Sequence, residues 1–211
     1  MIAWHDNIPV ISWMALFGRC RYCKKTISWL YPFIELTTTI LLTCLYLYIP
    51  HQYFFSYFIF ISALIVTIRS DIETMLISRY VTLFLVPVAF LLSWHGLLPI
   101  SFFASICGAV IGYLFLSIIN YIFKYATNKD GIGEGDFDLL CFIGSFTGIF
   151  GCWATVTIGS TLGSIFGIIY LLYACYFTEK TISTKIPFGP FLAFSAIMYV
   201  FLQHIVNAYF M

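Results

Sequence analysis

Long runs of apolar residues separated by short polar segments make up most of the chain. A helix needs about 20 residues to cross the apolar core of a bilayer, and most of these runs approach or exceed that length. The runs do not show the alternating pattern that is typical of membrane β-strands. We therefore predict an all-α, polytopic helical membrane protein with about seven transmembrane helices, over Tyr31–Ile49, Tyr53–Ile68, Tyr80–Trp94, Ile100–Phe123, Phe137–Phe150, Cys152–Phe177 and Pro187–Phe210.

The fifth run, Phe137–Phe150, is short for a transmembrane helix, and only Gly151 separates it from the sixth. We predict that these two runs form a helical hairpin with a tight turn. The first arm of this hairpin is expected to be partly sunk among other helices.

The composition supports a membrane protein. The chain is 62% hydrophobic and only 9% charged, whereas a soluble domain carries roughly 25% charged residues. We therefore predict that the lipid bilayer is a partner of this chain. The sequence has no basic tail and a net charge of only +1, so we predict no nucleic-acid partner. It also has no cleavable signal peptide pattern.

All ten Lys and Arg residues fall in four segments, at the N-terminus and after the second, fourth and sixth runs. With seven spans these segments share one side of the membrane, which the positive-inside rule makes the cytoplasm. We predict a cytoplasmic N-terminus, an external C-terminus, a short cytoplasmic segment over 1–29 and a membrane domain over 30–211. The basic residues are Arg19, Arg21, Lys24, Lys25, Arg69, Arg79, Lys124, Lys129, Lys180 and Lys185.

Two acidic clusters lie at span boundaries on this same side. Asp71 belongs to "RSDIETMLISR", and Asp136 belongs to "DGIGEGDFDLL". Two carboxyl groups brought close together cannot both stay ionised, so one acts as a base and the other as an acid. A water molecule between them could then attack a peptide carbonyl. The alternative is a proton-coupled membrane transporter that uses interfacial acids, although transporters usually place their acids nearer mid-membrane.

The second acidic cluster contains three glycines, Gly131, Gly133 and Gly135. Glycine permits positive φ angles and the close approach of another chain. A helix that begins after such a loop exposes unpaired N–H groups, to which a substrate backbone could bind. The simpler interpretation is a solvated loop with a helix N-cap.

Four segments carry a resemblance to one family. "GEGDFDLL" resembles the GxGD signature of the type IV prepilin peptidases, also called prepilin leader peptidases. "SDIETMLIS" resembles the segment with the first catalytic aspartate, D-x-D/E followed by I-P-N. "IPFGPFLAF" resembles I-P-F-G-P-x-L-A, and residues 4–38 resemble the family's cytoplasmic region. These segments occur in the family's order and cover nearly the whole chain.

The resemblance implies an aspartic endopeptidase with Asp71 and Asp136 as catalytic residues and with Gly133, Gly135 and Glu73 as substrate or loop support. Such enzymes cut the basic leader from type IV prepilins or pseudopilins at the cytoplasmic face of the bacterial inner membrane. Proteolysis would need no cofactor, and methylation of the new N-terminus would use S-adenosylmethionine. An inactive assembly factor is a further alternative, but both aspartates are present.

The chain departs from the family pattern in two segments near the predicted site. The family usually has Lys two residues after the second aspartate, where this chain has Asp138. The family's I-P-N reads Ile77, Ser78 and Arg79 here. Residues two apart on a helix point about 200° apart, so Asp138 need not touch Asp136.

The N-terminal region differs more. The family commonly has a first transmembrane helix and a first CxxC upstream, so we expect an N-terminally short member that keeps only "CRYC", Cys20 to Cys23. Two thiolates make half of a tetrahedral zinc site, which His5 or a second chain could complete; otherwise the thiols stay free. The upstream half of the region that the family associates with methylation would then be missing, so we expect N-methylation to be reduced or missing. Glu35 matches the family's Y-P-x-x-E and is a candidate functional acid inside a span.

Overall fold

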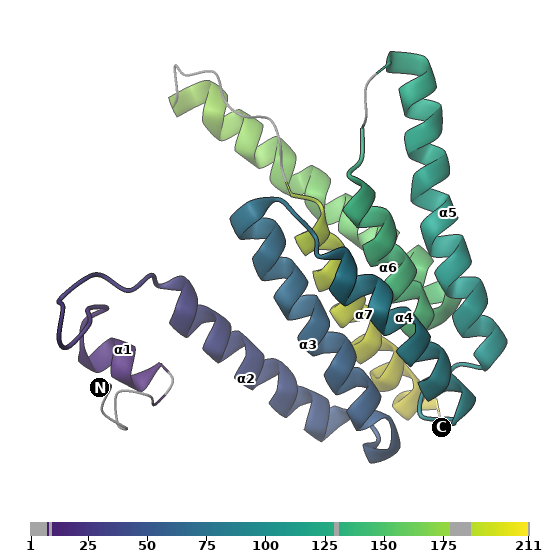
Figure 1. The fold of residues 1–211 in the computed structure, drawn as a ribbon, viewed down its shortest axis with the longest axis horizontal. Coiled ribbons are helices and arrows are strands. Elements are labelled where there is room, and N and C mark those ends of the chain that lie inside the picture. Colours follow the sequence, from purple (N-terminus) through teal and green to yellow (C-terminus); the bar gives the residue numbers. More distant parts are fainter. Residues whose placement is uncertain (1–7, 9, 129–130, 178–186, 211) are drawn as a thin grey trace. The chain divides into compact units, whose positions relative to one another are not determined.

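The computed structural model describes residue 8 and residues 10–128, 131–177 and 187–210 (Figure 1). It divides into two compact units, Met1–Ile49 and Pro50–Met211. Some residues on which predictions rested lie outside the described part of the chain, namely His5, Lys129, Lys180 and Lys185.

The first unit contains α1 (Ile11–Ala15) and the long apolar helix α2 (Leu30–Tyr48). Between them the chain folds back on itself through an antiparallel bridge between Arg19 and Thr26. The backbone N–H of Val10 donates to the Glu35 carboxylate at 2.9 Å. Glu35 therefore has a structural role, because it ties the segment before α1 to the first turns of α2.

The second unit is built from α3 (His51–Thr74), α4 (Arg79–Trp94), α5 (Phe102–Thr127), α6 (Glu134–Phe177) and α7 (Gly189–Phe210). Met75 and Asn128 end α3 and α5 in the left-handed conformation. The Ser101 hydroxyl caps α5 by accepting from the Ala104 N–H at 3.2 Å, which satisfies one of the helix's unpaired donors. These caps set where the connections between helices begin.

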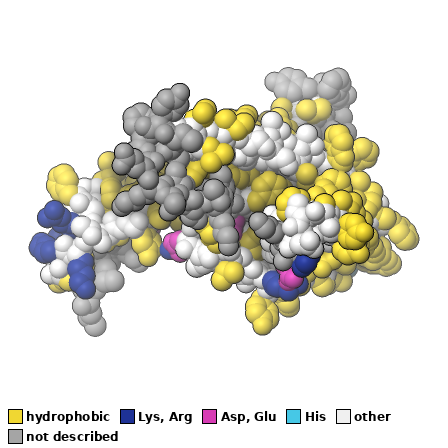
Figure 2. Space-filling view, turned by 90° about the horizontal axis from the view of Figure 1, so that it is seen from above, with side chains coloured by type: hydrophobic (Ala, Val, Ile, Leu, Met, Phe, Trp, Pro, Cys, Tyr) yellow, Lys and Arg dark blue, Asp and Glu magenta, His cyan; other side chains and the backbone are white. Residues whose placement is uncertain are grey.

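The prediction of an all-α, polytopic membrane protein is confirmed. In the described part of the chain, α2, α3, α5, α6 and α7 are long and apolar enough to cross a membrane, and α4 is a shorter apolar helix. Hydrophobic side chains cover much of unit 2 in Figure 2, and Phe103, Tyr121 and Trp153 are each more than 70% exposed. Such a surface suits lipid rather than water.

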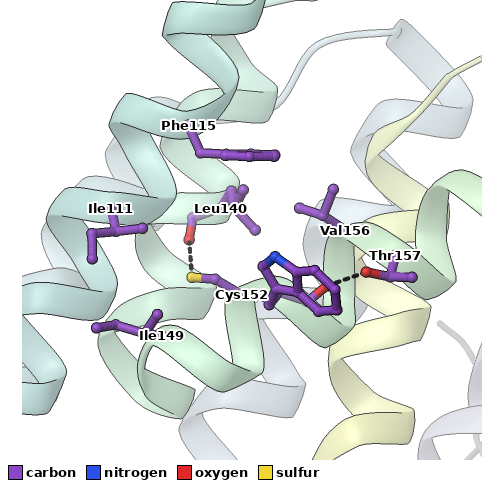
Figure 3. Close-up of a pocket in the computed structure, with 8 residues that line it drawn as sticks. Ile111, Phe115, Leu140, Ile149, Cys152, Val156 and Thr157 are labelled. Atoms are coloured by element: carbon purple, nitrogen blue, oxygen red, sulfur yellow. Dashed lines mark hydrogen bonds between the residues drawn. The ribbon is translucent and has the colours of Figure 1, made fainter.

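The hairpin predicted for the fifth and sixth runs is present within α6. The thiol of Cys152 donates to the carbonyl oxygen of Leu140 at 3.8 Å (Figure 3), although a straight helix would separate these residues by about 18 Å. The turn lies at Gly148, which has a φ of 73°, rather than at the predicted Gly151. Only glycine adopts that φ readily, whereas Gly151 lies in the second arm against Thr147.

The first arm of this hairpin is buried as predicted, with Leu139, Phe142, Ile143 and Phe146 fully buried. It packs against α5 through small residues. A Cβ atom added at Gly108 would clash with the Gly144 carbonyl, and one added at Gly112 would lie 2.5 Å from the Leu140 carbonyl. Small residues four apart permit this close helix packing in membranes.

An apolar cavity of about 180 Å³ lies between α5 and the two arms of α6. Figure 3 shows the side chains that line it, which include Phe115, Ile149 and Val156. The lining carries no carboxyl, imidazole or amine group. This cavity therefore offers no acid–base chemistry, and the predicted acids lie elsewhere.

Aromatic side chains set the register between α3 and the first arm of α6, which run in opposite directions in Figure 1. The rings of Phe60 and Phe146 stack with their centroids 4.9 Å apart. Asp71 follows Phe60 by about 16 Å of helix, and Asp136 precedes Phe146 by about 15 Å. This register carries both aspartates to the same end of the bundle, where α7 packs against α3 and α6.

We predict that the C-terminus lies on the side of the membrane opposite the N-terminus. The reason is that the ten basic residues lie only at the N-terminus and in every second connection, which places seven spans between the two ends. A reporter that fluoresces only in the cytoplasm, fused after residue 211, should give no signal, and alkaline phosphatase at the same position should be active. Strong cytoplasmic fluorescence would contradict the predicted topology and the crossing of the α6 hairpin.

Candidate active site

Asp71 lies in the last turn of α3 and is 6% exposed. Its carboxylate accepts a hydrogen bond from the backbone N–H of Gly189, the first residue of α7. The N–H groups at a helix N-terminus have no partner within the helix and carry a partial positive charge. A Cβ atom added at Gly189 would lie 2.6 Å from Oδ2 of Asp71, so this contact requires glycine.

Asp136 lies in the first turn of α6 and is 9% exposed. Its carboxylate accepts from the backbone N–H of Gly133, and its own N–H donates to the Gly133 carbonyl at 3.1 Å. An acid at the third position of a helix commonly reaches back to the capping residue in this way. The helix N-terminus thus fixes Asp136 by its own geometry.

The structure brings Asp71 and Asp136 together, since their carboxyl groups interact electrostatically. Ile77, in the connection between α3 and α4, packs against two glycines near the aspartates, Gly135 and Gly189. A Cβ atom added at Gly135 would lie 2.9 Å from Cβ of Ile77, and one at Gly189 would lie 3.0 Å from its Cδ1. Gly135 therefore allows the close approach of another chain segment.

The glycine loop before α6 is anchored by a residue that the sequence did not single out. Oδ1 of Asn120, on α5, accepts from the N–H groups of both Gly131 and Ile132 at 3.0 Å. The sequence did offer one signal for this role, because Asn120 is a side-chain amide inside the otherwise apolar run Ile100–Phe123. Gly189 was also missed as a site residue, although it belongs to the "IPFGPFLAF" segment.

Glu73 has its partner on its own helix. Its carboxylate pairs with Arg69 at 3.2 Å, and the two side chains are 45% and 38% exposed. An exposed pair of this spacing contributes only about 0.3–0.5 kcal/mol to helix stability. The support role predicted for Glu73 therefore stays a prediction.

Asp138 is buried, with 1% of its side chain exposed. Its Oδ2 accepts from Nε of Arg79 at 2.7 Å. Nη1 of the same guanidinium lies 3.5 Å from Oε2 of Glu134. Asp138 thus faces the first residue of α4, as expected for a side chain that projects away from Asp136.

Cys20 and Cys23 lie in the tight turn closed by the bridge from Arg19 to Thr26. The N–H of Cys20 donates to the Lys25 carbonyl at 2.9 Å, and the N–H of Lys24 donates to the Cys20 carbonyl at 3.0 Å. Among the described residues, no group of three or more His, Cys, Asp or Glu could hold a metal ion. The two thiols alone do not fit a closed tetrahedral zinc site.

The fold and the site define a helical membrane protein with two buried, interacting aspartates at one end of its bundle. Residues 58–172 match the model of the type IV leader peptidase family, and residues 1–49 match the bacterial peptidase A24 N-terminal domain. The chain belongs to the type IV leader peptidase family, as the sequence motifs predicted.

Curated relatives agree with this assignment. Proteins named prepilin leader peptidase/N-methyltransferase from Pectobacterium carotovorum subsp. carotovorum, Stutzerimonas stutzeri and Xanthomonas campestris pv. campestris are 32%, 33% and 34% identical to the chain. The matches cover 93%, 90% and 91% of this chain, and 69%, 64% and 66% of the respective relatives. The chain thus spans about two thirds of their length. No solved structure matches it significantly.

Proposed function

We propose that the chain is an aspartic endopeptidase that removes the basic leader from type IV prepilins or pseudopilins at the cytoplasmic face of the membrane. The observation that carries this proposal is the pair of buried carboxyl groups of Asp71 and Asp136, held near each other by two helix ends. Family membership supports the substrate class. It also favours a peptidase over the transporter alternative.

The proposed chemistry uses one shared proton. The ionised carboxyl group takes a proton from a water molecule as that water attacks the scissile carbonyl carbon, and the protonated one donates its proton to the carbonyl oxygen. The C–N bond of the resulting tetrahedral intermediate then breaks as the newly protonated carboxyl group gives its proton to the leaving amine, while the other carboxylate takes a hydroxyl proton back from the intermediate. The N–H donors from Gly189 and Gly133 hold each carboxylate in place during these transfers.

The sequence alone predicted reduced or missing methylation, but the relatives' names include N-methyltransferase, and on that ground we propose methylation of the new N-terminus as a second activity of this chain. S-adenosylmethionine would supply the methyl group. The described residues show no feature that we assign to its binding. Mass spectrometry of the mature pilin tests this activity through an added mass of about 14 Da, the mass of one CH₂.

Processing of a type IV prepilin tests the proposed peptidase. The chain is co-expressed with a prepilin in a strain that lacks other prepilin peptidases, with the Pectobacterium relative as positive control. We expect a shift to the mature mobility and a product that begins directly after the leader. A prepilin that the relative cuts but this chain leaves intact would contradict the proposal.

The cysteine pair gives a separate prediction. We expect Cys20→Ser and Cys23→Ser to keep the cleavage rate within about threefold of the unmodified chain, because the two carboxyl groups supply the proton transfers. For the same reason, a metal chelator should not reduce the cleavage rate. Initial rates with purified protein would measure this. A loss of cleavage that added zinc restores would contradict it and would assign the metal a part in proteolysis.

A further inference from the structure

We propose that Arg79 is a positioning residue for Asp136. It pairs with the buried carboxylate of Asp138 and approaches Glu134, and by neutralising Asp138 it keeps the first turn of α6 in place, an arrangement that we call the clamp. This inference rests on the proposed function, because Asp136 matters only if it takes part in cleavage. The clamp lies beside the two aspartates, and neither the family assignment nor the relatives' names refer to it.

The geometry of the clamp follows the period of the helix. Glu134 and Asp138 are four residues apart, so their side chains lie on one face of α6. Asp136 lies midway between them in sequence and projects about 200° away from each. Arg79 donates from Nε to Asp138 at 2.7 Å and approaches Glu134 with Nη1 at 3.5 Å. One guanidinium therefore contacts both ends of the turn that carries Asp136, and these ion pairs do not involve the carboxylate of Asp136.

Burial makes this contact important for Asp138. A carboxylate that is 1% exposed has lost nearly all its water and needs a hydrogen-bonded cation in its place. Arg79 meets this need at little cost to itself, since its side chain is 55% exposed. Without the guanidinium, Asp138 would retain a buried, unpaired charge, and the first turn of α6 would rearrange to expose it.

The position of Arg79 on its own helix supports the same role. Arg79 is the first residue of α4, where a cation opposes the positive end of the helix dipole. The local sequence thus gives a guanidinium no electrostatic advantage at that place. The partners across the helix interface, Asp138 and Glu134, account for it.

Both residues of this ion pair are departures from the family motifs. Asp138 stands where the motif has Lys, and Arg79 stands where I-P-N has Asn. The structure shows that these positions touch each other. In this chain the positive charge at position 138 is thus supplied by Arg79 of α4 and not by a side chain of α6.

Steady-state cleavage of a prepilin by the full chain in lipid nanodiscs tests the clamp. Arg79→Gln should lower kcat about tenfold or more and change KM less than about twofold, because displacement of a catalytic group affects the chemical step. Asp138→Asn should stay within about threefold of the unmodified chain, since the amide oxygen still accepts from Nε. Arg79→Lys should recover part of the loss by restoring the charge.

The decisive comparison is the double variant Arg79→Gln with Asp138→Asn. Removing both charges leaves no unpaired buried carboxylate, so kcat should recover to within about threefold of Asp138→Asn alone. If Arg79→Gln does not accumulate in the membrane, the double variant should still accumulate and cleave. Arg69→Gln is the matched control, because it removes an exposed guanidinium that pairs with Glu73 on its own helix, and its kcat should be unchanged.

Three results would overturn the clamp. They are an Arg79→Gln variant with unchanged kcat, a raised KM at constant kcat, which would place Arg79 in contact with substrate, and a double variant no better than Arg79→Gln. Asp136→Asn is measured alongside. If Asp136→Asn is inactive while Arg79→Gln is normal, only the clamp fails, whereas an active Asp136→Asn overturns the proposed function itself.

Discussion

Replacement of Asp71 or Asp136 by Asn is expected to lower the rate of prepilin cleavage by on the order of 10³-fold or more. Asn has nearly the same shape as Asp but can neither take up the proton of the attacking water nor donate one as a carboxylic acid. Both side chains are buried at helix ends, and loss of a buried charge from this interacting pair should not hinder folding. The measurement is the initial rate of cleavage at equal protein abundance in the membrane.

The double variant adds a second criterion. Because the two carboxyl groups act as a unit, the variant with both replacements should be no slower than either single variant. Equal thermal stability of all three proteins in detergent serves as the folding control. Cleavage at near the normal rate by either single variant would exclude that aspartate from the chemistry.

Gly189→Ala is expected to reduce cleavage by about 100-fold while the protein still folds. The new Cβ atom would lie 2.6 Å from Oδ2 of Asp71 and 3.0 Å from Cδ1 of Ile77. The backbone of α7 is held by its packing against α3 and α6, so the Asp71 carboxylate is the group that must move. A displacement of about 1 Å in a catalytic group can cost on the order of 10²-fold in rate.

Gly163→Ala is the matched control for this variant. Gly163 faces the same helix α7, but a Cβ atom there would meet Phe191 at 3.6 Å, an ordinary van der Waals distance. We expect it to retain activity within about twofold. Comparable activity of Gly189→Ala and Gly163→Ala would mean that the contact between Gly189 and Asp71 does not position a catalytic group.

The helices could be predicted from the sequence because the bilayer imposes one strong constraint, the length of an apolar run. The hairpin in α6 was predicted from the shortness of Phe137–Phe150. Its turn was placed at Gly151 because that glycine divides the two runs, whereas the structure turns at Gly148. A glycine needed for its φ angle and a glycine needed for close packing look alike in a sequence.

The two aspartates could be predicted as a pair, since both lie at boundaries on the same side. Their partners could not. Which helix N-terminus faces Asp71 depends on how α7 packs, and Gly189 is far from Asp71 in the sequence. The ion pair between Arg79 and Asp138 has the same origin, because side-chain contacts between helices follow from packing and not from local periodicity.

Cleavage of a full-length prepilin by the purified chain, with mass spectrometry of both products, tests the central claim most directly. The reaction is run in nanodiscs with the unmodified chain and with the Asp71→Asn and Asp136→Asn variants. We predict a single cut at the end of the basic leader by the unmodified chain and intact prepilin with either variant. An intact prepilin with the unmodified chain, or the same cut by the variants, would contradict the claim that these two carboxyl groups hydrolyse the leader bond.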